Sequence, residues 1–139
     1  MKNEPITIQT FIDSPIEKVW AFWTNPNHIN QWAFASDDWE ARNAENDLRV
    51  GHRFKTTMAA KDGSQSFDFT GIYTNISENK SIEYDLDDGR NVKIVFETLP
   101  EGTSVIQVFD PEMKNSRELQ QAGWQAILDN FKKYVENSP

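Results

Sequence analysis

The sequence predicts an α+β domain in which a curved antiparallel sheet grips a long C-terminal helix, with two short helices after the first strand. Strand-like segments joined by short turns fill residues 38–110. Such short connections require antiparallel neighbours, because a parallel crossover takes about a dozen residues or more. One long helical pattern follows Pro111. Only this segment is long enough to cover the apolar face of the sheet.

The N-terminal elements are predicted from a change of period. Residues 6–11 alternate apolar and polar side chains, which is typical of a half-buried strand. The Ser-Pro-Ile-Glu sequence at 14–17 has the pattern of a capping box with Pro at the first helical position, which predicts the start of a helix. Asn25-Pro26 ends this helix. A short second helical turn then carries Ile29 and Trp32 inward.

Strand character recurs through the middle of the chain, and turn residues separate the strands. Glycine-containing turns are expected at 61–64, 87–90 and 100–102. The polar stretch 43–47 is interpreted as the end of the first of these strands. The expected strands are 39–42, 51–59, 67–76, 82–86, 92–96 and 103–109.

The C-terminal segment has an apolar stripe at helical spacing from Leu119 to Tyr134. About twenty residues at 1.5 Å each make a helix of roughly 30 Å, which can cross a small sheet. We expect Trp124, Phe131 and either Ile127 or Leu128 to face the sheet.

Composition limits the classes of function. A chain of 139 residues fits a single domain, 1–139. With 22 acidic and 14 basic residues, the net charge is −8, which disfavours nucleic acid and anionic membranes as partners. The chain contains no Cys, and we find no signal peptide and no apolar stretch of about 20 residues. These features predict a cytoplasmic protein.

No pattern in the chain predicts a catalytic group, a metal site or a cofactor. The two histidines, His28 and His52, have no partner at metal-ligand spacing, and we place them at the surface and at a strand start. Neither a Gly-x-Ser-x-Gly elbow nor a phosphate-binding loop occurs. The acidic pairs 37–38 and 87–88 are interpreted as solvated turns.

Several motifs resemble one known superfamily. The stretches are 14–20, 24–32, 47–54, 62–64, 67–71 and 123–131, which span nearly the whole chain in the family's order. They are similar to the START/Bet v 1-like helix-grip superfamily, also called SRPBCC, and within it to the C-terminal domain of the activator of heat shock protein 90 ATPase. His52 stands where relatives commonly have a second Gly. The resemblance implies a hydrophobic cavity between sheet and helix that binds lipids, hormones, polyketide-like compounds or other apolar molecules.

Large apolar side chains are the candidates to line this cavity, and their alternative is an ordinary packed core. Gln107 is added because it shares a strand face with Val105 and Phe109. An inward amide needs a partner that a ligand can supply, whereas the opposite register leaves it in solvent. The candidate ligand-binding residues are Trp32, Phe54, Met58, Phe67, Phe69, Tyr84, Phe96, Gln107, Trp124, Ile127, Leu128 and Phe131.

The function expected from these observations is the binding of a small hydrophobic, lipid-, sterol- or polyketide-like molecule. A first alternative is a cyclase- or dehydratase-like enzyme in the same cavity, with Tyr73, Tyr84, Arg53 and Asp68 as the polar groups that project into it. A second alternative is a module that contacts a chaperone, as the resemblance implies. The sequence specifies neither the ligand nor the oligomeric state.

Overall fold

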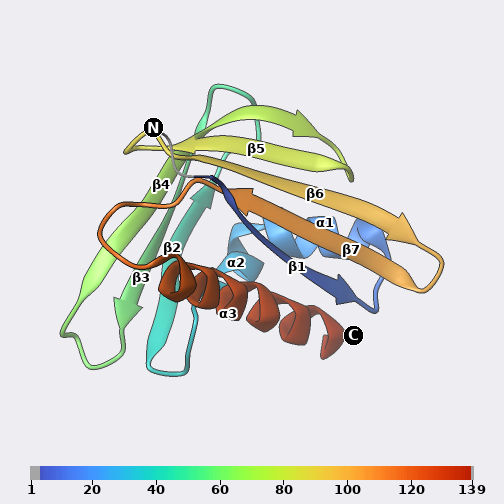
Figure 1. The fold of residues 1–139 in the computed structure, drawn as a ribbon. Helices are drawn as coiled ribbons and strands as arrows, with labels where there is room; N and C mark the ends of the chain where they lie inside the picture. Colours follow the sequence, from blue (N-terminus) through green and yellow to red (C-terminus); the bar gives the residue numbers. More distant parts are fainter. Residues whose placement is uncertain (1–3, 139) are drawn as a thin grey trace.

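The computed structural model describes residues 4–138, and within them one sheet of seven strands and three helices (Figure 1). The elements follow the predicted order, strand, two short helices, antiparallel strands and a long helix. In chain order they are β1 (Ile6–Ile12), α1 (Ile16–Thr24), α2 (Pro26–Trp32), β2 (Trp39–Asn46), β3 (Arg53–Ala60), β4 (Ser66–Ser77), β5 (Ser81–Leu86), β6 (Asn91–Leu99), β7 (Gly102–Phe109) and α3 (Arg117–Glu136).

All strand pairs are antiparallel, in the order β1-β7-β6-β5-β4-β3-β2. The strands from β2 to β7 are sequential neighbours, and β1 pairs with β7, so that Ile8 lies opposite Gln107. The sheet curls around α3, which crosses its concave side (Figure 1). The predicted fold class, a curved antiparallel sheet that grips a C-terminal helix, is therefore confirmed.

Strand β2 is longer than the sequence predicts. The polar stretch after Arg42 does not end it, because a bulge between Arg42 and Glu45 takes up the irregular residues and pairing with β3 resumes. Asn43 adopts a positive φ of 56°, a conformation that Asn tolerates better than most residues. The bulge carries the strand on to Asn46, which contributes to the site described below.

The start of α1 differs from the predicted capping box. The residue before the helix is Pro15, and no side chain caps it. Ser14 is buried, and its carbonyl accepts a hydrogen bond from Thr103 Oγ1 at 2.8 Å. Ser14 therefore joins the helix start to β7. A side-chain cap is found instead at α2, where Asn25 Oδ1 accepts from the Asn27 amide at 2.9 Å.

Helix α3 runs along β1, one of the two edge strands. Its side chains bind carbonyl groups of that strand: Gln125 Nε2 donates to Gln9 O at 3.2 Å, and Lys132 Nζ donates to Phe11 O at 2.7 Å. Glu136 accepts the Asp13 amide at 2.9 Å just beyond the strand. These bonds occupy polar groups of an edge that would otherwise be open to pairing with another chain.

Trp124, Leu128 and Phe131 of α3 point inward as expected, but the apolar stripe does not mark the buried side along its whole length, because Leu119 at its start is exposed. Leu128 and Phe131 are buried, and the ring of Trp124 stacks on Phe109 of β7 with centroids 3.9 Å apart. Phe131 meets Trp32 of α2 edge-on at 4.7 Å. The core therefore joins α3 both to the sheet and to the short helices. No helix in the described part of the chain has the length and apolar character that crossing a membrane requires.

Candidate functional site

A cavity of about 290 Å³ lies between α3, the short helices and the inner face of the sheet. It exists because the closest backbone neighbours of α3 are β1 and the short helices, while the strands from β3 to β5 curve away on the other side. Side chains from α1, α2, α3, β2, β3, β4, β5 and β7 line it. Its volume is near the lower end of the range of about 300–1,000 Å³ that is usual for ligand pockets.

Aromatic rings form most of the far wall of the cavity. Phe54 of β3 is their centre, with its ring 4.7 Å from that of Tyr84 and 5.8 Å from that of Phe69. Gly71 makes this packing possible, because a Cβ there would lie 2.9 Å from the Phe54 ring and 2.7 Å from Asp85 O. The ring of Trp124 closes the α3 side, edge-on to Phe69 at 6.1 Å.

Two polar side chains of the wall, Tyr73 and Asn46, form a short hydrogen-bond network. The Tyr73 hydroxyl donates to Asn46 Oδ1 at 2.5 Å, and Asn46 Nδ2 donates to the Thr24 carbonyl at 2.6 Å. The bulge in β2 brings Asn46 to this position. This network connects β4, β2 and α1, so these groups hold the wall in place.

Three other polar side chains of the wall have no such partners. Thr56, Tyr84 and Gln107 are each 6% exposed, and their side chains make no hydrogen bond to another described residue. Among the described residues, however, every polar side-chain atom that is fully shielded from solvent has a hydrogen-bond partner. The hydroxyl and amide groups of these three residues therefore border the open space of the cavity, which all three line.

Both tyrosines of the wall are neutral at physiological pH. Burial raises the pKa of Tyr84 and that of Tyr73 well above the usual value of 10. Each hydroxyl therefore keeps its proton and acts as a hydrogen-bond donor, not as a base.

Two charged side chains among the described residues contribute to the lining of the cavity. Arg90 contributes to the lining, and its Nε is 2.8 Å from Asp88 Oδ2. Glu45 also contributes and is exposed to solvent. The cavity reaches the surface beside Phe67, which lines it and is 52% exposed, with the Trp39 ring 6.1 Å away.

The structure brings most of the predicted ligand-binding residues together around one space. Phe96 and Phe131 do not line it: Phe96 packs edge-on against Trp20 at 5.5 Å, in the core behind the cavity. For these two residues the packed-core alternative holds. The predicted residues that line the cavity are Trp32, Phe54, Met58, Phe67, Phe69, Tyr84, Gln107, Trp124, Ile127 and Leu128.

Several lining residues were not among the predicted set. Thr56 could have been found from strand alternation, because it lies between Phe54 and Met58 on the same face of β3. Asn46 could not, because the polar stretch was interpreted as the end of a strand. The lining residues that no sequence pattern assigned to the cavity are Trp23, Ile29, Ala33, Glu45, Asn46, Thr56 and Arg90, whereas Tyr73 lines it as the enzyme alternative expects.

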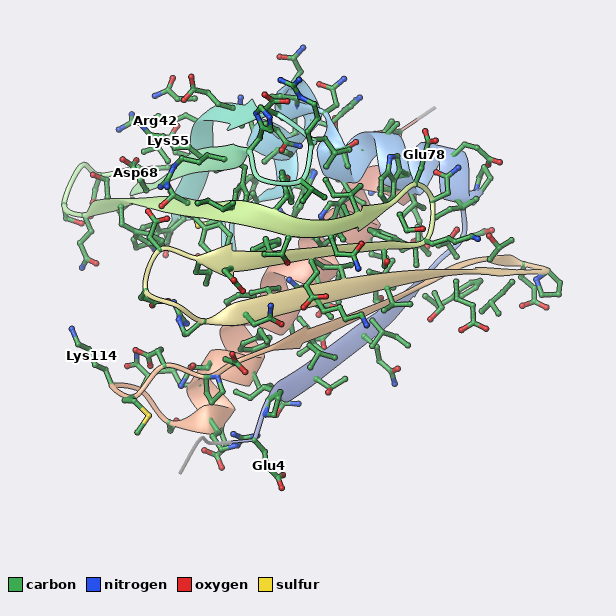
Figure 2. The ribbon with its side chains drawn as sticks, turned by 90° about the horizontal axis from the view of Figure 1, so that it is seen from above. Glu4, Arg42, Lys55, Asp68, Glu78 and Lys114 are labelled. Carbon is green, nitrogen blue, oxygen red and sulfur yellow. The ribbon has the colours of Figure 1, made fainter. Side chains whose placement is uncertain are left out.

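The prediction that Arg53 and Asp68 project into the cavity is wrong. Arg53 is exposed and pairs with Asp87 at 2.8 Å. Asp68 accepts from Thr57 Oγ1 at 2.8 Å and lies beside Lys55 on the outer side of the sheet (Figure 2). Alternation explains both cases, since each residue is next to an inward-facing Phe in its strand.

The histidines are placed differently from one another. His52 lies just before β3, as expected, with Nδ1 2.9 Å from Asp47 Oδ2. His28 is not a plain surface residue, because it is half-buried, stacks on Phe22 at 3.9 Å and has Nδ1 2.6 Å from the Tyr134 hydroxyl. Within residues 4–138, no three His, Cys, Asp or Glu side chains are grouped so as to hold a metal ion.

Comparison with known proteins connects this architecture to a family. The profile of the family described as activator of Hsp90 ATPase homolog 1-like protein matches residues 13–136. A search of curated proteins gave no match.

Solved structures give the same family and fold. The AHSA1-like protein from Aeromonas hydrophila is 47% identical, with a TM-score of 0.90 over 95% of this chain and 92% of that one. A protein from Cytophaga hutchinsonii is 51% identical, with a TM-score of 0.84 over 97% and 94% of the two chains. A protein from Chromobacterium violaceum shares the fold at 22% identity, with a TM-score of 0.85 over 97% and 99%. Since the family profile covers most of its length, the chain belongs to the family of activator of Hsp90 ATPase homolog 1-like proteins.

Proposed function

We propose that this protein binds a small hydrophobic molecule in the cavity between α3 and the sheet. The observation that carries the proposal is an aromatic-walled space of about 290 Å³ that opens to solvent beside Phe67. Apolar walls with a few polar groups are the usual chemistry of small-molecule sites. We propose the cytoplasm as the place where the protein acts.

The lining supports binding more than catalysis. The described residues around the cavity include no His, Cys or Ser. Glu45 is exposed at the margin, and the two buried tyrosines keep their protons. The cavity therefore holds hydrogen-bond donors but no buried carboxylate or imidazole to act as a general base.

The first prediction is that a bound compound stabilises the fold. A ligand that binds only the folded state adds about 2.7 kcal/mol at a hundredfold excess over its Kd, which raises the Tm by about 5 °C or more. The measurement is a thermal-shift titration with fatty acids, sterols and flavonoid-like polyketides. The fluorescence of Trp32 and Trp124 should change on binding, since both residues line the cavity.

A blocking variant separates binding inside the cavity from binding elsewhere. Thr56→Phe places a ring in the open space, because Thr56 lines it. We expect this variant to fold and to lose the ligand-dependent rise in Tm. Thr57→Phe is the matched control, since the Thr57 side chain binds Asp68 on the outer side of the sheet, and it should keep that rise.

Two results would contradict the proposal. The first is that no compound of the panel moves the Tm or shifts the amide NMR signals of the cavity residues. The second is that Thr56→Phe binds as well as the parent protein does. Either result would leave a chaperone contact, which the family description names for its type member, as the function to test next.

A further inference from the structure

Three polar side chains of the cavity wall indicate the chemical class of the ligand. Thr56, Tyr84 and Gln107 are almost completely buried and have no hydrogen-bond partner among the described residues. Buried polar groups of folded proteins are nearly always partnered, because leaving them unpaired is costly. Their polar atoms border the open space of the cavity, so a molecule that fills this space and displaces water has to complete their hydrogen bonds.

We propose that the cavity selects a neutral aromatic compound that bears a hydroxyl or carbonyl oxygen, and that Tyr84 and Gln107 bind this oxygen. The inference rests on the proposed function, and it adds the chemical class of the ligand. The Tyr84 hydroxyl both donates and accepts, and the Gln107 amide offers two donors and one acceptor. Both side chains can therefore bind a hydroxyl or a carbonyl group, whereas neither finds a partner on a plain hydrocarbon.

The charges around the cavity favour a neutral ligand over a carboxylate. Arg90 is the one positively charged residue among the described lining residues, and its Nε pairs with Asp88 at 2.8 Å. Glu45 adds a negative charge at the margin. A ligand carboxylate would have to share Arg90 with Asp88, so it would recover less of the hydration that it loses than it would beside an unpaired cation.

The shape of the walls favours flat rings over flexible chains. Trp124 and Phe69 meet edge-on at 6.1 Å, and Phe54 and Tyr84 meet edge-on at 4.7 Å. Aromatic rings pack well with one another in edge-on and offset geometries. A compact ring system also fits a volume of about 290 Å³ at lower cost in conformational entropy than a long chain.

The experiment compares three compounds that share one ring system: naphthalene, 2-naphthol and 2-naphthoate. The full-length chain is titrated with each compound at neutral pH, and the Kd is measured from amide NMR shifts. We expect 2-naphthol to bind about tenfold more tightly than naphthalene, because the oxygen gains hydrogen bonds in a buried site. We expect 2-naphthoate to bind more weakly than 2-naphthol.

Variants test whether the named residues cause this preference. Tyr84→Phe and Gln107→Leu each remove hydrogen-bonding atoms with little change of shape, so each should reduce the preference for 2-naphthol over naphthalene by about threefold or more. Tyr134→Phe is the matched control. It removes a hydroxyl that is bound to His28 outside the cavity, and it should leave the preference unchanged.

The outcomes separate this inference from the proposed function. If naphthalene and 2-naphthol bind equally, or if 2-naphthoate binds most tightly, the inference is wrong while binding in the cavity stands. An unchanged preference in both Tyr84→Phe and Gln107→Leu would overturn it in the same way. If neither these three compounds nor the wider panel binds, the proposed function itself fails.

Discussion

Replacing Phe131 by Ala is expected to lower the free energy of unfolding by about 3–5 kcal/mol. The Phe131 side chain is fully buried, and its ring meets Trp23 at 4.9 Å and Trp32 at 4.7 Å, both edge-on. The substitution removes these contacts and leaves a void where α1, α2 and α3 meet. Since domains of this size are stable by only about 5–15 kcal/mol, the variant should be close to unfolding. Urea denaturation followed by circular dichroism measures the change.

The control for this prediction lies on the same helix. Leu119 is 61% exposed, so Leu119→Ala should change the free energy of unfolding by no more than about 0.5 kcal/mol. A loss below about 1 kcal/mol for Phe131→Ala would contradict the described packing of α3 against the short helices.

Gly102→Ala is expected to destabilise the protein by about 3 kcal/mol, through overpacking rather than through a void. A Cβ at this position would lie 2.2 Å from the carbonyl oxygen of Ile12 and 3.2 Å from the Cα of Asp13. Both atoms belong to the backbone, so the end of β1 would have to move away from the β6–β7 turn. The midpoint of urea denaturation at constant slope measures the cost.

The same substitution at Gly123 is a control with the opposite expected sign. Gly123 lies inside α3, and apart from its own stretch of helix no atom is within 4 Å of the position that its Cβ would take. Ala is a better helix former, so Gly123→Ala should stabilise the protein by about 0.5–1 kcal/mol. If Gly102→Ala were as stable as the parent protein, the close approach of β1 to the turn would be disproved.

The sequence predicted those features that follow from the spacing of apolar residues within one element. In α3 the expected residues Leu128 and Phe131 are buried, whereas Leu119 at the start of the apolar stripe is exposed. The turns at Gly63 and Gly89 were predicted from residue type instead, because Gly readily adopts the positive φ that each of them has. Strand β2 shows the limit of such patterns, because a bulge at Asn43 needs the partner strand β3 to hold it in register.

The identity of the cavity residues depended on contacts between distant segments. Strand β7 is apolar on both faces, so only its pairing between β1 and β6 decided that Gln107 faces inward. Alternation likewise cannot show that Phe69 borders open space while Phe96 is packed against Trp20.

By itself the sequence determined the order, type and inward faces of most elements, and hence the fold. These features follow from local periodicity, which every short stretch of chain contains. Only the tertiary structure decided where α3 and the sheet separate, and that separation leaves Tyr84, Gln107 and Thr56 around an open space. The size of a cavity depends on the distance between the packed elements around it. That distance is set by the combined volumes of side chains that lie far apart in the sequence.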